Sequence, residues 1–361
     1  MRLGEPVAQR HELLAKSGET LRMEMASHHL EGSQAVQGGR AHLGHALAEG
    51  RQLGTRIRHE ARRLLYPAMA TPDGSGDVLL RTLSQDGGIT VRALEATRVV
   101  AEAAQRHATG PLVTVALGRV LMGAILLGAG GKHDETVQLR FRGNGPLRTL
   151  LAIADAGAHV KGYATRLRAE LDPSSGVAQA IGLGDLAVVR HRPGWNQPYT
   201  GIVPIVHGEI AQDLALYLTE SEQMPSAVAL GVQLDGTGEV TAAAGYLAQA
   251  LPGAAEEMRE RLEANVESLP SPSHLVRGGE GARAIAERLL HGMGLRELEA
   301  REARFLCGCT RERVIRAVAL LGKEEVEELR VAGVPIEVRC EFCAERYEID
   351  PDHVRALFPD A

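Results

Sequence analysis

The spacing of apolar and polar residues changes along the chain and predicts a mixed fold. Between 91 and 106, apolar residues recur every three or four positions, which is typical of an amphipathic helix. The stretch from Leu112 to Gly130 is almost entirely apolar, as in a helix that is buried on every side. From 137 to 142 the period falls to two, which predicts a half-buried strand.

Short alternating runs follow, separated by turn residues. We expect one helix, at 210–219, and strands at 150–154, 159–164, 186–191, 201–207, 228–234 and 240–246. The dipeptide Asp235-Gly236 lies between the last two runs and predicts a hairpin. Strands joined by hairpins and mixed with helices predict an α+β fold, with an N-terminal mixed α/β domain of hairpin-built sheets at 76–252.

Residues 253–302 form a segment of a different kind. Apolar residues at helical spacing predict two amphipathic helices, from 255 to 269 and from 282 to 293, with a Pro- and Ser-rich break between them. Two such helices cannot enclose a core, so we expect a helical linker that lies on another part of the chain. The pattern leaves open whether this linker stays docked or is released on a signal.

The last residues, 303–361, are predicted to form a small C-terminal module. We expect helices at 311–320 and 323–330, a strand at 334–339, and a final helix that is capped by Asp350. A module of roughly sixty residues buries only a marginal core, and a structural metal is a common remedy.

Residues 1–75 are rich in Gly, Arg and His and lack a regular apolar pattern. We expect an extension that is disordered or partly helical, with helical pieces at 8–25 and 43–65. The pair His28-His29 lacks the regular spacing of a metal site. Met69 stands just before the ordered pattern, so we expect that synthesis can start there, and it stays open whether 1–68 are part of the native protein.

Bulk composition narrows the function classes. The length suggests two or three domains, and 44% hydrophobic residues are ordinary for a protein with a buried core. A net charge of −6 argues against a nucleic-acid binder that relies on broad electrostatic attraction. Arg119 in the middle of the apolar stretch favours a core helix over a membrane span. We also find no apolar run suited to a signal peptide in 1–50, and we expect a cytoplasmic protein.

All four cysteines fall in one window near the end of the chain. Cys307 and Cys309 form a C-x-C pair, and Cys340 and Cys343 form a C-x-x-C pair thirty residues later. Two close pairs separated by a folded insert can place four sulfurs at the corners of a tetrahedron, which is the geometry of a closed Zn²⁺ site. We therefore predict that these four residues bind one Zn²⁺. Such clustering is unlike the dispersed disulfides of secreted proteins.

The spacing alone leaves several functions open. Thiolates that bind a metal are also what oxidants attack, so both an inert structural zinc site and a redox switch fit. A zinc ribbon that docks on a partner fits as well. A thiol oxidoreductase that uses Cys340 and Cys343 fits less well, because the pair lacks a βαβ context. The chain contains neither Gly-x-Ser-x-Gly nor His-Glu-x-x-His, and we expect no enzyme.

The cysteine pattern has a family resemblance. The run Phe305-x-Cys307-x-Cys309-Thr310, followed by Cys340-x-x-Cys343 and Tyr347, resembles the zinc module of the heat-shock protein 33 family of redox-regulated holdase chaperones. The stretches that resemble the N-terminal domain of that family are 137–146, 199–203, 217–225 and 245–252. The resemblance extends in order from 77 to 358, and residues 1–75 have no counterpart in it.

This resemblance implies an ATP-independent chaperone that oxidation controls. In reducing conditions the four cysteines would bind one Zn²⁺, and the protein would be an inactive monomer. Peroxide or hypochlorite would form the disulfides Cys307–Cys309 and Cys340–Cys343. The module and the linker would then lose their structure, and an active homodimer would bind unfolded client proteins. The resemblance does not specify the clients, the oxidant threshold or the client-binding surface.

Overall fold

The computed structural model describes residues 21–25 and 76–358, apart from 132–133 and 170–174. Residues 77–358 and the strand β1 (Leu21–Met25) belong to one compact unit. β1 contradicts the end of the helix predicted at 8–25. The other predictions for the extension, the start at Met69 among them, lie outside the described residues. The fold is α+β as predicted, and the proposed domain boundaries remain predictions.

The first sheet has five antiparallel strands in the order β11-β2-β3-β10-β9. The strands are β2 (Val78–Ser84), β3 (Ile89–Glu95), β9 (Ser226–Leu234), β10 (Val240–Ala250) and β11 (Leu295–Glu302). The predicted hairpin joins β9 to β10, and the Asp235 carboxylate accepts hydrogen bonds from the backbone N–H groups of Thr237 (2.8 Å) and Glu239 (3.0 Å).

The helix predicted at 91–106 is wrong in its first third. Residues up to Glu95 form β3, and the helix α3 (Thr97–His107) begins only afterwards. Ile89, Val91 and Ala93 alternate with less buried residues, and β3 pairs with strands on both sides. The alternation outweighs the helical spacing because a central strand buries one whole side of its residues.

Asp77 ties the start of α3 to the end of the linker. Its buried carboxylate accepts hydrogen bonds from the backbone N–H groups of Arg98 (3.1 Å) and Val99 (2.7 Å), so it caps a helix that has no cap residue of its own. Its carbonyl oxygen accepts a hydrogen bond from Ala303 N (2.9 Å). Burial raises the pKa of Asp77 from 3.8 to about 6, with the nearby charge of Glu95 acting in the same direction.

The second sheet has six strands in the order β12-β6-β5-β4-β7-β8. Its strands are β4 (Thr136–Gly143), β5 (Thr149–Asp155), β6 (His159–Ala164), β7 (Gly184–His191), β8 (Tyr199–Ile205) and β12 (Arg304–Phe305). All neighbours are antiparallel except β12 and β6, which are parallel. The predicted strands are confirmed, whereas the short β12 was not foreseen.

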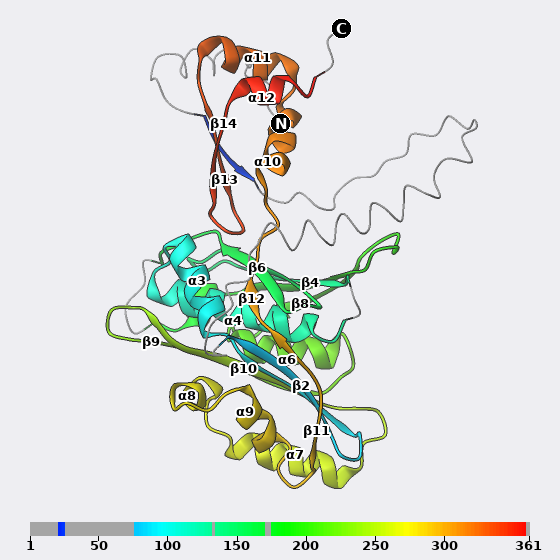
Figure 1. Cartoon of the computed structure of the whole chain (residues 1–361). Coiled ribbons are helices and arrows are strands. Elements are labelled where there is room, and N and C mark those ends of the chain that lie inside the picture. The colour runs from blue at the N-terminus through cyan, green and yellow to red at the C-terminus, as the bar shows by residue number, and fades with distance from the viewer. Residues whose placement is uncertain (1–20, 26–75, 132–133, 170–174, 359–361) are drawn as a thin grey trace, which may run out of the picture. The chain divides into compact units, whose positions relative to one another are not determined.

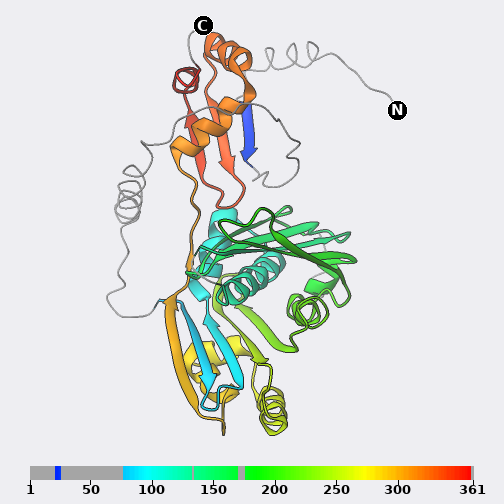
Figure 2. The same cartoon turned by 90° about the vertical axis from the view of Figure 1, so that its right-hand side faces the viewer.

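The apolar helix α4 (Pro111–Gly128) lies between the two sheets and packs on strands of both (Figures 1 and 2). The helix α6 (Ile210–Glu220) packs beside it, and a short helix, α5 (Val177–Ile181), lies between β6 and β7 in the sequence. A Cβ on Gly123 of α4 would lie 2.7 Å from Leu214 Cδ1 of α6, so glycine allows the two helices to approach closely.

Among the described helices, α4 alone is long and apolar enough to span a membrane, and 78% of it is buried in the protein, as predicted for a core helix.

Three linker helices cover the outer face of the five-stranded sheet (Figure 1). They are α7 (Glu256–Ser268), α8 (Pro272–Arg277) and α9 (Ala282–Leu289). Their apolar side chains pack on the sheet rather than on a core of their own, and those that are buried include Leu262, Leu275, Ile285, Leu289 and the nearby Met293. The two predicted helices are confirmed. The short helix α8 and the strand at 295–302 were not predicted from the sequence.

The remaining residues form what we call the cysteine module (306–358). It contains α10 (Arg311–Val318), a 3-10 turn (Ala319–Leu321), α11 (Lys323–Ala332), β13 (Ile336–Cys340), β14 (Arg346–Ile349) and α12 (Pro351–Arg355). Asp350 caps α12 as predicted, accepting from Asp352 N at 2.9 Å. The buried apolar residues of this core are Val314, Val318, Val326, Ile336, Val338, Ile349 and Val354. β1 pairs with β13 in parallel.

Candidate metal centre

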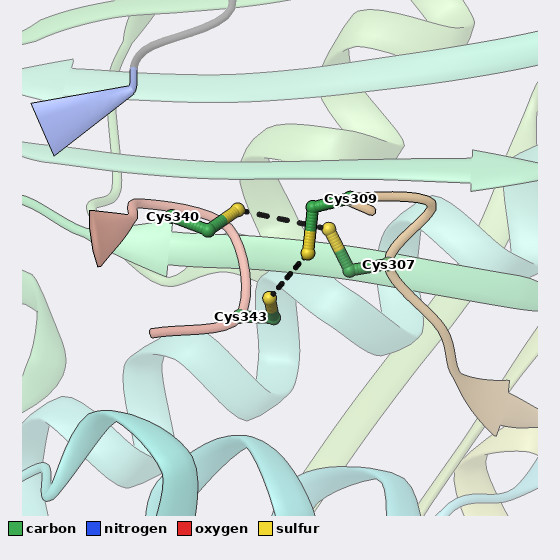
Figure 3. A group of neighbouring side chains, drawn as sticks. All are labelled: Cys307, Cys309, Cys340 and Cys343. Carbon is green, nitrogen blue, oxygen red and sulfur yellow. Dashed lines mark hydrogen bonds between the residues drawn. The ribbon is translucent and has the colours of Figure 1, made fainter. Parts of the chain in front are cut away.

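Two short segments carry the four cysteines to one place (Figure 3). Cys307 and Cys309 follow β12 directly, Cys340 ends β13, and Cys343 lies in the turn that leads to β14. That turn is closed by hydrogen bonds from Ala344 N to Cys340 O (2.8 Å) and from Cys340 N to Glu345 O (2.9 Å). Ala344 has a φ of 59°, which lets the chain reverse within a few residues.

The four sulfurs form a tight group. All four Sγ atoms lie within 4.8 Å of one another, with 3.8 Å between Cys307 and Cys340 and 3.2 Å between Cys309 and Cys343. No disulfide joins any two of them. Cys340 and Cys343 are buried, and the other two are half-buried. The structure therefore brings together all four cysteines that the sequence analysis singled out.

The donor set and its dimensions fit a zinc ion. A Zn–S bond is about 2.3 Å long, so sulfurs at the corners of a tetrahedron around Zn²⁺ lie roughly 3.8 Å apart. The observed separations bracket this value. Four soft thiolate ligands, with no imidazole or carboxylate in the group, favour zinc over a hard cation.

Hydrogen bonds within the cluster separate the pKa values of the thiols. The pKa of Cys309 is lowered, mainly by a hydrogen bond from Cys307, and the Tyr347 hydroxyl donates to Cys309 Sγ at 3.3 Å with the same effect. The pKa of Cys340 falls to about 7, mainly through its hydrogen bond with Cys307, whereas that of Cys343 rises. Part of the group is thus stabilised as thiolate, the form that binds metals.

Phe342, between the second pair of cysteines, docks the turn on the two-sheet region, which we define as residues 77–305. The Phe342 side chain is buried and meets the Tyr163 ring edge to face, with 5.4 Å between centroids. Lys161 Nζ lies 4.6 Å from the Phe342 centroid. The carbonyl oxygen of Phe342 is 3.3 Å from Nε2 of the buried His107. This turn is therefore fixed from outside the module as well as from within it.

The first cysteine pair is anchored in a similar way. Phe305 is buried, and Leu306 N donates to Val160 O of β6 at 2.7 Å. The Arg106 guanidinium lies 5.9 Å from the Phe305 ring centroid, and it also pairs with Glu345 at 3.5 Å. These docking residues were not predicted from the sequence. One signal could have indicated them: Phe342, a large apolar residue, lies in the turn between Cys340 and Cys343, where polar residues are more common.

Histidines are common metal ligands and catalytic groups, but His191 and His207 are not part of the cysteine group. His191 ends β7, and the backbone N–H of His207 donates to Asp213 at 2.9 Å. The Gly-rich turn after α4 ends that helix, and its Lys132 and His133 lie outside the described residues. Within the described part of the chain, the four cysteines are the one group suited to hold a metal ion.

Comparison with known proteins gives a consistent result. The model of the Hsp33 protein family matches residues 77–350. The 33 kDa chaperonin of Thermus thermophilus is 43% identical over 294 residues, which cover 77% of this chain and 86% of that protein. The 33 kDa chaperonin of Desulforamulus reducens is 39% identical over 286 residues, covering 78% of this chain and 97% of that one.

A solved structure agrees with these matches. The crystal structure of the 33 kDa chaperonin (heat shock protein 33 homolog) from Thermotoga maritima superposes with a TM-score of 0.71 at 34% sequence identity. The superposition covers 78% of this chain and 97% of the other.

Proposed function

The chain belongs to the Hsp33 family of chaperones, and from this premise we propose that it is a redox-regulated, ATP-independent holdase. In the proposal, the reduced, zinc-bound protein is an inactive monomer in the cytoplasm. The oxidised, disulfide-bonded protein is an active homodimer that binds unfolding client proteins, and neither nucleic acid nor a membrane is a partner. One observation carries the proposal: four thiols lie together where a strand of the two-sheet region enters the module.

Cys307, Cys309, Cys340 and Cys343 would hold the ion in the reduced state. A bound Zn²⁺ would link the two segments and contribute on the order of 10–16 kcal/mol to the folded module. The module needs such a contribution because the core that it encloses by itself consists of a few Val and Ile side chains. Tyr347 supports the site through its hydrogen bond to Cys309.

Oxidation would remove these ligands. Formation of Cys307–Cys309 and Cys340–Cys343 takes four electrons from the four thiols, and two molecules of peroxide that accept them become water. Each proposed bond joins cysteines that are neighbours in the sequence. Neither bond would link the two segments, so both ways of holding the module together, through a metal or through a cross-link, would be lost.

The chain then transmits this loss to the linker. β12 and β11 are consecutive, so 295–309 runs from the edge of the five-stranded sheet into the cysteine cluster (Figure 2). The linker helices have no core apart from the sheet face that they cover. Once they leave, apolar side chains of that face, Leu80, Val91 and Tyr246 among them, are exposed. An exposed apolar face of this kind binds unfolded chains.

The test follows zinc and chaperone activity in the same sample. A chromogenic chelator reports zinc release during peroxide treatment, and light scattering reports aggregation of a heat-unfolded client. We expect zinc release and suppression of aggregation to rise together, and both to reverse on reduction. A Leu320→Ala variant is the control, because Leu320 is an exposed residue of the module that belongs neither to the thiol group nor to the buried core.

Two outcomes would reject the proposal. Equal suppression by the reduced and the oxidised protein would remove the switch. Zinc that stays bound after peroxide would favour a permanent structural site that docks on a partner.

A further inference from the structure

We propose that the edge of β2, which β11 covers in this structure, is a binding site for extended segments of client proteins. The client would add to the five-stranded sheet as a strand in place of β11. This inference rests on the proposed function, because it requires the linker to leave, and it goes beyond the proposal by naming the surface and the form of the bound client.

β11 is held mainly through its backbone. It pairs with β2 from Leu295, opposite Ser84, to Glu302, opposite Val78, with one irregularity after Glu297. None of its residues is buried. Leu295 packs against the linker-helix cluster, which is proposed to leave as well. The other side-chain partners are exposed or half-exposed ion pairs, such as Glu299 with Arg81 at 3.1 Å, and pairs of this kind contribute little to stability. A strand attached in this way can detach without disturbing the core.

β2, in contrast, is held independently of β11. Leu79 is fully buried in the core that contains α4, whereas Leu80 faces the linker helices, so the two sides of the strand pack in different layers. Its other edge pairs with β3 from Leu79, opposite Leu94, to Leu83, opposite Thr90. β2 therefore stays in place when β11 leaves, and it then presents a row of open backbone N–H and C=O groups.

The residues of β11 show what this edge accepts. Their sequence, LRELEARE, is charged, and the side chains point mostly to solvent, so the edge selects for an extended backbone rather than for particular side chains. Binding by strand addition takes its affinity from backbone hydrogen bonds in this way. The sheet face next to this edge, uncovered when the linker leaves, adds apolar contacts. The two features together fit extended, apolar segments of non-native proteins.

The experiment uses the full-length oxidised protein and synthetic peptides of residues 295–302. In an antiparallel pair, only alternate N–H groups point at the neighbouring strand. One peptide is unmodified, one carries N-methyl groups at 299 and 301, and one carries them at 300 and 302. The two methylated peptides have identical side chains and identical composition. Residue-resolved amide exchange at 78–84 reports occupancy of the edge.

We expect oxidation to increase exchange at alternate amides of 78–84. The unmodified peptide and one of the methylated peptides should restore protection, and the other should need at least about tenfold more peptide, a difference of roughly 1.4 kcal/mol. A heat-unfolded client should restore protection at the same amides. The permissive methylated peptide should displace that client, and the other should not.

The opposite results would overturn the inference. Equal effects of the two methylated peptides would mean that binding uses the apolar face alone. Unchanged exchange at 78–84 on oxidation, or on client binding, would mean that the edge does not open or is not used. Failure of the proposed function is a separate result, because the oxidised protein would then not suppress aggregation, whatever the peptides do.

Discussion

The two-sheet region and the cysteine module are folded by different means. The first encloses large side chains that are fully buried, such as Tyr217, Phe141 and Met122, in cores on both faces of a sheet. The second encloses a few Val and Ile residues beside four thiols. Apolar burial is insensitive to oxidants, whereas thiolate ligation is not. On the proposed function, an oxidant would unfold the cysteine module and leave the two-sheet region intact.

Removal of the metal is expected to have the largest effect. A chelator that is strong enough to extract Zn²⁺ should abolish amide-exchange protection at the β13–β14 pairs, such as Val338 with Tyr347, because the lost stabilisation is on the order of 10 kcal/mol. Protection in α4 should be unchanged. The contrast fails if the metal-free module keeps its protection, or if α4 loses protection at the same time.

A core substitution should give the opposite pattern. Phe141→Ala removes a fully buried ring from β4 and should lower the free energy of unfolding of the two-sheet region by about 3–5 kcal/mol. Zinc affinity, measured by competition with a chelator, should stay within about twofold of the parent value. The reason is that Phe141 lies on β4, whereas the side chains that dock the turn of Phe342, which are His107, Lys161 and Tyr163, come from α3 and β6. A large loss of zinc affinity would show that the two parts are not independent.

Asp77 makes the stability of the two-sheet region depend on pH. Its pKa is about 6 in the folded protein and 3.8 otherwise, so the folded state binds the proton more tightly. The stabilisation from protonation is present at low pH and is lost as pH rises from about 4 to above 6. The unfolding free energy of the parent, minus that of Asp77→Asn, should thus fall by up to about 3 kcal/mol between pH 4 and pH 7.

Thermal denaturation of the reduced, zinc-loaded proteins across this pH range checks the prediction. A constant difference between the two proteins would contradict it. Glu95 and Arg98 are the charged groups nearby, and both are unchanged in the variant, so only their interaction with the Asp77 charge remains in the difference.

Phe342→Leu should have the smallest effect, and it tests the contrast at the point where the two parts meet. Leucine keeps an apolar side chain in the buried position but removes the ring contacts with Tyr163 and Lys161, which are together worth about 1–2 kcal/mol. Zinc should still bind, but half-maximal zinc release should need less peroxide than in the parent. Leu320→Ala should behave like the parent. An unchanged peroxide dose would mean that docking of this turn does not restrain the module.

The sequence predicted the features whose signals are local. The cysteines of each pair lie two or three positions apart, and the two pairs are all the cysteines of the chain, so Cys307, Cys309, Cys340 and Cys343 could be grouped without knowledge of the fold. The alternation at 137–142 identified β4 because one side of that strand is buried and the other is not.

The features that were missed depend on distant neighbours. β11 has no apolar side, because it lies at a sheet edge and is held through its backbone, so no periodicity marked it as a strand. The contact between His107 and Phe342 joins residues 235 positions apart in the sequence. Neither residue type by itself indicates a contact, and only the folded chain brings the two together.

The hydrogen bond from Tyr347 to the sulfur of Cys309 has a practical consequence. Tyr347 is the one tyrosine in residues 303–361, and the chain has a single tryptophan, Trp195, which stacks on Arg192 between β7 and β8. Tryptophan emission should therefore be nearly silent about the module. Tyr347 is one of six tyrosines in the chain, so its near-ultraviolet signal, which reports on the sulfur of Cys309, is obtained as the difference between the parent and Tyr347→Phe. The protein carries its own optical probe at the cluster, and the state of the thiols can be followed without any attached dye.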